Sequence, residues 1–342
     1  MSLLSLQHLV RLTDETGLIQ HAYYGIPRRR DGYSADDNAR ALILVARQYA
    51  VEPREQLVDL ATIYLSYLQH GQMDNGMFRN FLDYDQHWAD LPTGDDCQGR
   101  CLWALAELLA STMPASLKSA AAEMLDRALG WFRPERPLHS LAFALLGFDA
   151  LSRRGDGDRW HDRMAPAADR LAGALDGASA NGWTWFDDTM TYANGRLPHA
   201  MLAAARMLGR DRYLEAGRKS LDFLIRVTVQ DDMLVPVGTD GWYPQGGVKA
   251  RFDQQPIEAM ALIEAALAAW TILNETRYLD VARTCGRWFV GHNCLGKPLA
   301  DIEEGSCCDG LTPYGPNANQ GAESTLSLLI SRQALAKYDL ND

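Results

Sequence analysis

The feature that most constrains the fold is an alternation of two kinds of helical segment along all 342 residues. Six segments are rich in Ala and Leu and carry few charges on any face, a pattern typical of helices buried on most sides. They begin near residues 37, 96, 138, 195, 255 and 321. Between them lie six segments in which apolar residues recur at steps of three and four, as in REQLVDLATIYLSYL from residue 54.

This near-regular spacing indicates a repeated helical hairpin, a unit that cannot bury its apolar face alone. Such hairpins stack as an open solenoid or close into a ring. Helices that are apolar on most faces favour a ring, because they can fill its centre. No linker or low-complexity stretch divides the chain. We therefore predict an all-α fold, a single (α/α)6 toroid or barrel domain of six helical hairpins over residues 1–342.

Charge and composition exclude several classes of partner. Lys and Arg total 33 and Asp and Glu total 44, which gives a net charge of −11 and argues against nucleic acid. No stretch of 18 or so uninterrupted apolar residues predicts a membrane span, and the N-terminus lacks the pattern of a secretory signal. The six cysteines are expected to be reduced thiols in a cytoplasmic protein. The sequence does not determine the oligomeric state.

The loops that lead into the six apolar helices differ from the turns that leave them. In a ring of hairpins, these entering loops gather at one end, and here they are rich in Trp, Tyr and Asp. The turns at the other end are shorter and plainer, as in RMLGRDRYLE from residue 206. This asymmetry predicts one ligand site, at the end where the loops gather. The loops read DGYSADD (31–37), MFRNFLDYDQHWADLPTGDD (77–96), RPERPLHS (133–140), NGWTWFDDTMTYANGRLPH (181–199), DGWYPQGGVKARFDQQP (240–256) and DGLTPYGPNANQG (309–321).

Carboxylates stand where four of the apolar helices begin. One explanation is helix capping, since Asp binds free backbone N–H groups and favours the positive end of the helix dipole. Two adjacent aspartates exceed what one cap needs, so we expect one member of each pair to be functional. The candidate catalytic carboxylates are Asp36, Asp37, Asp96, Asp253 and Glu323.

Aromatic and polar residues surround these carboxylates in the loops. A pyranose ring offers an apolar C–H face and a rim of hydroxyls, which flat aromatics, carboxylates, amides and arginines can bind. Two histidines at helix starts are either proton-transfer groups or structural residues. The predicted substrate-binding residues are Tyr33, Asp95, His139, Trp185, Arg196, His199, Trp242, Gln254, Asn319 and Gln320.

We expect no metal and no organic cofactor. Cys97 and Cys101 lie four residues apart, but no further His or Cys pair completes a zinc set. The chain also lacks a G-x-S-x-G elbow, a phosphate-binding glycine loop and a dinucleotide fingerprint.

Five stretches together resemble a bacterial family within the six-hairpin glycosidase superfamily. The resemblance covers nearly the whole chain and implies an (α/α)6 barrel with carbohydrate-active chemistry. Members of that family often carry only a glycosyltransferase label, which does not fit because no doubly wound nucleotide-sugar domain is present. The stretches are DGYSADDNARALIL, DDCQGRCLWALAEL, WTWFDDTMTYANGRLPHAML, DQQPIEAMALIEA and GPNANQGAESTLSLL.

The first functional hypothesis is a glycoside hydrolase that acts on a small oligosaccharide with two carboxylates as general acid and base. More distant inverting glycosidases of this fold place one carboxylate in an early Asp-rich loop and another near the last inner helix. Glu323 as acid and Asp37, or Asp36, as base match that placement. Asp96 and Asp253 would grip hydroxyls or replace one of the pair.

Two other hypotheses belong to different classes. Fold relatives that isomerise sugars at C2 use histidines as proton shuttles, and here these would be His139 and His199. A ring without two carboxylates near one sugar would instead be a non-catalytic carbohydrate-binding protein. A polysaccharide lyase would need a cationic groove, which the charge of −11 disfavours.

Overall fold

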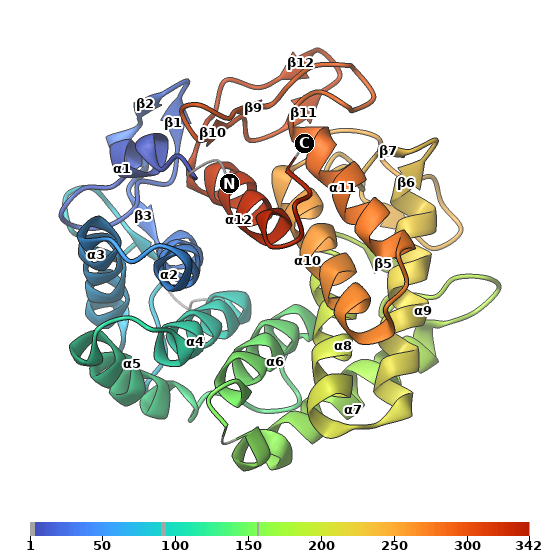
Figure 1. The fold of residues 1–342 in the computed structure, drawn as a ribbon, viewed down its shortest axis with the longest axis horizontal. Coiled ribbons are helices and arrows are strands. Elements are labelled where there is room, and N and C mark those ends of the chain that lie inside the picture. Colours follow the sequence, from blue (N-terminus) through green and yellow to red (C-terminus); the bar gives the residue numbers. More distant parts are fainter. Residues whose placement is uncertain (1–3, 90–93, 156, 342) are drawn as a thin grey trace.

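The computed structural model describes residues 4–89, 94–155 and 157–341, so the stretch 90–93 of the second long loop lies outside the described residues. Within them, twelve α-helices form an inner ring and an outer layer (Figure 1). Each inner helix contacts the next, and the last inner helix contacts the first, so the ring is closed. The predicted (α/α)6 barrel is confirmed.

The inner helices begin within two residues of the predicted positions. The inner helices are α2 (Ala35–Val51), α4 (Asp95–Ala110), α6 (Leu138–Ser152), α8 (Arg196–Leu208), α10 (Pro256–Leu273) and α12 (Ala322–Ala336). The outer helices are α1 (Gln7–Leu12), α3 (Glu55–Gly71), α5 (Ala115–Ala128), α7 (His161–Ala178), α9 (Asp211–Thr228) and α11 (Arg277–Phe289). Two short 3-10 helices are η1 (Arg29–Asp31) and η2 (Gly157–Trp160).

Short strands, which the periodicity did not predict, join the loops. Two of the six antiparallel pairs connect different loops: Tyr33 pairs with Leu82, and Thr189 with Pro244. They join the loop before α2 to the loop before α4, and the loop before α8 to the loop before α10, within the rim that the entering loops form. The pairs are β1 (Ala22–Tyr23) with β2 (Ile26–Pro27), β3 (Tyr33–Ser34) with β4 (Phe81–Leu82), β5 (Thr189–Met190) with β8 (Tyr243–Pro244), β6 (Val229–Gln230) with β7 (Met233–Leu234), β9 (Ala300–Asp301) with β10 (Ser306–Cys307), and β11 (Leu311–Thr312) with β12 (Gly315–Pro316).

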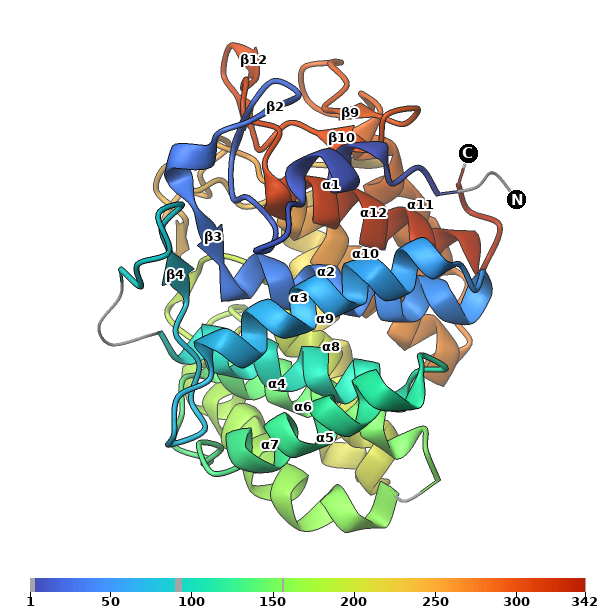
Figure 2. The same cartoon turned by 90° about the vertical axis from the view of Figure 1, so that its left-hand side faces the viewer.

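The two ends of the barrel differ as predicted. Two of the loops that enter inner helices are long and cover residues 229–255 and 290–321. Two of the turns that leave inner helices are short and cover only residues 209–210 and 274–276. Gly209 and Asn274 end α8 and α10 in the left-handed conformation, which permits such tight turns. In Figure 2 the inner helices begin to the left, at what we call the loop end, and end to the right, at the turn end, while the loop that carries β9, β10 and β12 passes over the top.

Helix α10 has the length and hydropathy of a membrane span, although two glutamates interrupt its apolar residues, as the sequence predicted for every segment. It is 18 residues long with a mean hydropathy of 1.5, and among the described helices it alone is long and apolar enough to cross a membrane. However, 72% of it is buried inside the barrel, and it carries Glu258 and Glu264. Its apolar character is that of a core helix surrounded by protein.

Close packing between inner helices makes one glycine indispensable. A Cβ built on Gly99 of α4 would lie 2.5 Å from the carbonyl oxygen of Ser140 on α6. On the outer helix α7, a Cβ built on Gly173 would meet no atom within 4 Å. A side chain at Gly99 is therefore excluded by the neighbouring helix, whereas one at Gly173 is not.

We expect Gly99→Ala to lower the free energy of unfolding by about 1–3 kcal/mol, because the helices α4 and α6 must move apart. The matched variant Gly173→Ala should instead raise it by up to about 1 kcal/mol, because alanine loses less entropy in a helix. Urea unfolding followed by circular dichroism measures both. An equal effect of the two variants would contradict the close packing of α4 on α6.

Candidate active site

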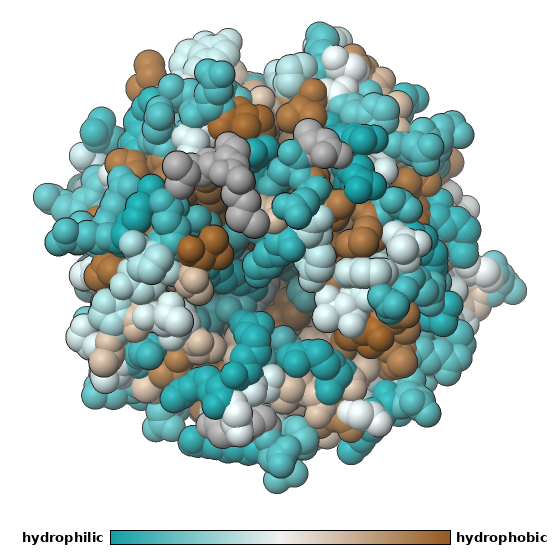
Figure 3. All heavy atoms as spheres, in the orientation of Figure 1, coloured by the Kyte–Doolittle hydropathy of each residue, from teal (hydrophilic) through white to brown (hydrophobic). Residues whose placement is uncertain are grey.

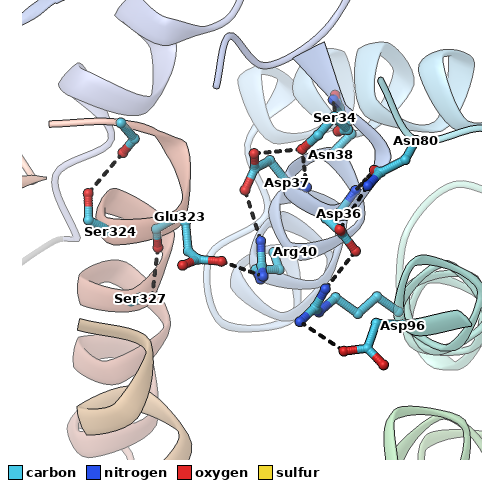
Figure 4. Close-up of polar contacts among 12 residues, drawn as sticks. Ser34, Asp36, Asp37, Asn38, Arg40, Asn80, Asp96, Glu323, Ser324 and Ser327 are labelled. Atoms are coloured by element: carbon cyan, nitrogen blue, oxygen red, sulfur yellow. Dashed lines mark hydrogen bonds and ion pairs between the residues drawn. The ribbon is translucent and has the colours of Figure 1, made fainter. Parts of the chain in front are cut away.

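The first turns of the inner helices bring charged side chains together at the loop end. Figure 4 shows part of this group, with side chains from α2, α4 and α12 directed toward one another. We call the whole group the loop-end cluster. It comprises Asp36, Asp37, Arg40, Asp96, Arg100, His139, Tyr192, Glu258, Asp309 and Glu323, which hydrogen bonds, ion pairs, ring stacking or electrostatic interactions connect.

Arg40 joins the first and last inner helices. Its Nη1 lies 2.9 Å from Asp37 Oδ1 and its Nη2 lies 2.7 Å from Glu323 Oε2, while the arginine side chain is only 8% exposed. Ser34 is the N-cap of α2, since its hydroxyl accepts from the backbone N–H of Asp37. A serine therefore fills the capping role, which leaves Asp36 and Asp37 for other contacts.

Arg100 makes the equivalent link between α4 and α2. Its Nη1 lies 2.7 Å from Asp36 Oδ1, and its Nη2 lies 3.9 Å from Asp96 Oδ2. Burial alone would raise the pKa of Asp36, but the charges of Arg100 and Arg40 outweigh it and lower that pKa. The hydroxyl of Tyr192 donates to Asp96 Oδ2 at 2.6 Å. These contacts hold Asp36 as an anion and fix the orientation of Asp96.

Two carboxyl groups of the cluster make no ion pair with any arginine in the described part of the chain. Burial raises the pKa of Asp309 to about 7, and the nearby charge of Glu323 adds to the shift. Burial likewise raises the pKa of Glu258 to about 7 against the effect of the Asn194 hydrogen bonds. Both groups are therefore partly protonated near neutral pH. Both lie near Glu323, whose carboxylate pairs with Arg40.

Glu258 is buried with one oxygen unused. Its Oε2 accepts from Asn194 Nδ2 at 2.9 Å and from the Asn194 backbone N–H at 3.3 Å. Its Oε1 has no hydrogen-bond partner among the described residues. An ionised carboxylate in this position would be poorly compensated, which is the physical reason for the raised pKa.

His139 stacks on Tyr192 at the edge of the cluster. The ring centroids are 4.6 Å apart, and His139 Nε2 donates to the Tyr192 carbonyl oxygen at 2.8 Å. Burial lowers the pKa of His139, although the charge of Asp96 opposes the shift. The imidazole is therefore neutral near pH 7, and its hydrogen bond leaves Nδ1 as the acceptor.

Other predicted residues lie in the rim and outside the cluster. Asp95 accepts from Trp131 and Arg136, each at 3.1 Å, and so fixes the loop before α6. Asp253 packs against Gly310, and its buried Oδ1 has no hydrogen-bond partner in the described chain. Burial raises the pKa of Asp253, and its charge in turn acts on Asp309, so this residue borders the cluster.

Several predicted sugar-binding residues are used inside the protein. Tyr33 is 1% exposed and donates to Asp14, and Trp185 is 1% exposed beside Phe186. Gln254 is fully buried and accepts from the indole N–H of Trp288. The rings and the amide of these three residues are therefore not free to contact a ligand in this structure.

The amides before α12 tie loops together. Asn319 Oδ1 accepts from the backbone N–H of Ala22 at 2.9 Å, and the Gln320 side chain lies 3.9 Å from the sulfur of Cys308. Trp242 lies partly buried in the loop before α10 and packs against the core.

Arg196 and His199 lie deeper along the barrel. Arg196 is 2% exposed and pairs with Glu264 at 2.6 Å. His199, one turn further along α8, borders a cavity that lies at the turn end. The structure does not bring His199 together with His139: the charged groups that shift the pKa of His199 are Glu264, Arg196, Arg47 and Glu107, whereas those acting on His139 are Asp96, Arg100 and Asp187.

Five members of the cluster were not among the site residues predicted from the sequence. Two of them had a signal, since Arg40 follows Asp36 by four residues and Arg100 follows Asp96 by four, which places each pair on one helix face. The other three, Tyr192, Glu258 and Asp309, had none beyond their positions in or beside the entering loops. In the described residues, no group of three or more His, Cys, Asp or Glu side chains is arranged to hold a metal ion.

The raised pKa of Glu258 predicts a pH-dependent stability. The folded pKa of about 7 exceeds the reference value of 4.5, so this group's contribution is complete below about pH 4.5 and is lost as the pH rises through about 7. Glu258→Gln should therefore raise the melting temperature by a few degrees at about pH 8 and have little effect at about pH 4.5.

Thermal unfolding at both pH values checks this expectation. Glu215→Gln, at an exposed residue of α9, is the matched control and should show no such difference. An equal gain from Glu258→Gln at the two pH values would mean that Glu258 does not titrate in this range.

No family model matches the sequence, and no curated protein matches it in sequence. Solved structures do match in fold. One is a sugar epimerase from a ruminal bacterium, with a TM-score of 0.74 and 11% identity, covering 96% of this chain and 94% of that one. Another is a cellobiose 2-epimerase from Bacillus thermoamylovorans, with a TM-score of 0.73 and 13% identity, covering 98% and 96%.

A third structure is an alpha-1,6-mannanase from Salegentibacter sp., with a TM-score of 0.66 and 11% identity, covering 97% of this chain and 96% of that one. It is an inactive variant in which two consecutive aspartates are replaced by asparagine, in complex with alpha-1,6-mannotriose. Identities this low establish the fold and not the activity. The chain thus has the (α/α)6 barrel fold that these solved structures share.

Proposed function

We propose that this protein is a glycoside hydrolase that cleaves a small oligosaccharide in the loop-end cluster. The observation that carries the proposal is the presence, in one cluster, of a carboxyl group with a pKa near 7 and of carboxylates paired with arginine. Glycosidic cleavage needs one carboxylic acid and one carboxylate around the same bond. Environments that separate the pKa values of neighbouring carboxyl groups produce such a pair.

Asp309 is the group suited to act as the acid. It is partly exposed, whereas Glu258, with a similar pKa, is buried. In the proposed step, Asp309 gives its proton to the glycosidic oxygen as the bond from that oxygen to the anomeric carbon breaks. The leaving sugar departs as an alcohol, and Asp309 is left as a carboxylate.

Glu323 is the group suited to act as the base. Its side chain is 36% exposed, and Arg40 holds one of its oxygens at 2.7 Å. It would take a proton from the water whose oxygen forms the new bond to the anomeric carbon. From its position in the sequence, Glu323 was predicted to be the acid, so this scheme gives it the opposite role. Asp37, which is buried behind Arg40, serves in this scheme to orient the arginine.

The other members of the cluster would bind hydroxyl groups. Asp96 is 20% exposed and retains acceptor capacity beyond its bond to Tyr192. His139, stacked on Tyr192, offers a neutral ring nitrogen on the same side. The fold relatives support a carbohydrate ligand, since the mannanase variant binds a mannotriose in the same fold.

Asp309→Asn and Glu323→Gln should each lower kcat by about 10²–10⁴-fold on a cleavable disaccharide, because each removes one proton-transfer group. Turnover of manno-, gluco- and galacto-configured disaccharides identifies the substrate and measures the loss. Asp280→Asn on α11 and Glu215→Gln on α9, both at exposed positions, are matched controls and should keep full activity.

The pH profile separates a catalytic role from a structural one. Since Asp309 must be protonated to act, kcat/KM should fall as the pH rises above about 7, and Asp309→Asn should lose that limb of the profile. Folding of each variant is checked by circular dichroism. Near-normal turnover in either folded variant would refute the assignment.

A sugar isomerase is the second candidate, and one observation favours it. His139 is a neutral imidazole inside the cluster, and two of the fold relatives are epimerases. His199 borders the opposite end of the barrel, so this route would pair His139 with another group, such as the Tyr192 hydroxyl.

Incubation with free hexoses in deuterated water distinguishes the two candidates. A hydrolase leaves the C2 proton in place, whereas an isomerase that removes this proton exchanges it for deuterium. We expect no exchange by mass spectrometry. Exchange that is lost in His139→Asn, without hydrolysis of any disaccharide, would replace the hydrolase proposal with the isomerase.

A further inference from the structure

The barrel has a cavity at the turn end. It has a volume of about 530 Å³, and residues of all six inner helices line it. Figure 3 shows the face at which the inner helices end, with a hollow at its centre surrounded by hydrophilic residues. This face lies opposite the loop-end cluster (Figure 2). The sequence predicts no site at this end, because its turns are short and plain.

The cavity is separate from the loop-end cluster. Between them, Trp103, Phe143 and Ile330 pack with Arg196 around a void of only about 10 Å³. A void of that size is at the lower limit for one water molecule. One sugar molecule therefore cannot extend from the loop-end cluster into the turn-end cavity.

Every carboxylate that lines the cavity already has cationic partners. Glu107 lies 2.5 Å from Arg47 and 2.6 Å from Arg153, and Glu264 lies 2.7 Å from Arg47. The second oxygen of Glu264 binds Arg196 at 2.6 Å.

The third carboxylate, Asp149, pairs with Arg206 and, at 3.7 Å, with Arg153. All three carboxylates are therefore neutralised, and none is left to bind a cationic ligand.

The side chains of the lining that still have N–H groups free for a ligand are cationic. Lys337 makes no hydrogen bond or ion pair in the described part of the chain, and burial together with the charge of Arg47 lowers its pKa. The side chains of Arg153 and Arg206 are 48% and 43% exposed and have N–H groups beyond those used by their partners. Four cations and three carboxylates line the cavity, which gives an excess of one positive charge: Arg47, Arg153, Arg206 and Lys337 against Glu107, Asp149 and Glu264.

His199 gives an independent sign of a ligand. It borders the cavity, and its Nδ1 is buried without a hydrogen-bond partner among the described residues. Burial lowers its pKa to about 3, so the ring is neutral and offers one donor and one acceptor. A neutral imidazole in this position suits a hydroxyl group and not a second charge.

We propose that the turn-end cavity binds one small organic anion of monosaccharide size. Its phosphate or carboxylate would pair with Lys337, Arg153 and Arg206, and its hydroxyls would reach His199. Arginine and lysine are the residues that recognise such anions, and the cavity volume is in the range of small-molecule sites, roughly 300–1,000 Å³. This site is independent of the proposed hydrolase activity.

Isothermal titration calorimetry on the full chain tests the proposal with glucose 6-phosphate, glucuronate and glucose. We expect at least one of the two anions to bind with one site per chain, and the one that binds identifies the anionic group. Lys337→Gln should weaken that binding at least about tenfold, the loss of one charged contact. Ala110→Phe, which fills part of the cavity, should abolish it, and Lys219→Gln on α9 should leave it unchanged.

Two results would overturn the proposal. One is the absence of binding of both anions to the native protein, with Lys337→Gln lowering only the melting temperature, as expected if the cations serve only the helix ends. The other is binding that survives both Lys337→Gln and Ala110→Phe but is lost in Arg100→Gln, which would place the anion in the loop-end cluster. If glucose binding releases heat and Ala110→Phe does not change that heat, then glucose binds at the loop end. This result separates failure of the anion-site proposal from failure of the hydrolase assignment.

Discussion

Buried arginines are the constraint on which the rest of the structure depends. Helices that are apolar on most faces enclose the barrel axis, yet carboxylates project into it, and an unpaired charge there would cost several kcal/mol. Each arginine joins different inner helices: Arg40 of α2 binds Glu323 of α12, Arg100 of α4 binds Asp36 of α2, and Arg47 of α2 binds both Glu107 of α4 and Glu264 of α10. Separation of two paired helices would leave a buried charge unpaired, so these pairs determine which helices lie side by side.

The same pairing separates the carboxyl groups into two chemical kinds. Arg100 and Arg40 lower the pKa of Asp36, whereas Asp309 and Glu258 make no such pair in the described structure and have pKa values near 7. The difference between Asp36 and these two groups arises from the position of guanidinium groups and not from residue type, although burial raises the pKa of Asp37 in spite of its contact with Arg40. A site with both kinds of carboxyl group can give and take protons at neutral pH, which is the property that the proposed hydrolase needs.

The sequence predicted the barrel closely because burial imposes its period on every inner helix. It also predicted that Asp36, Asp37, Asp96 and Glu323 would meet, since the loops of a closed ring converge. It could not predict loop conformation, which buries Tyr33 and Trp185 and brings Asp309 beside Glu323. It also could not predict that His199, one turn inside α8, would border the opposite end of the barrel. Periodicity determines which side of a helix is buried, but the depth of a residue along the barrel depends on where its helix begins.

The direction of the inner helices explains why the two ends differ in charge. All six run from the loop end to the turn end, so the partial positive charges of their N-termini add at the loop end and the partial negative charges of their C-termini add at the turn end. Carboxylates are favoured in the first turns, where Asp37, Glu258 and Glu323 lie. Cations are favoured at the other end, where Arg153 and Lys337 cap α6 and α12. Parallel inner helices thus favour an excess of carboxylates at the loop end, although Arg40 and Arg100 lie there too, and they favour the cations that outnumber the carboxylates Glu107, Asp149 and Glu264 at the turn end.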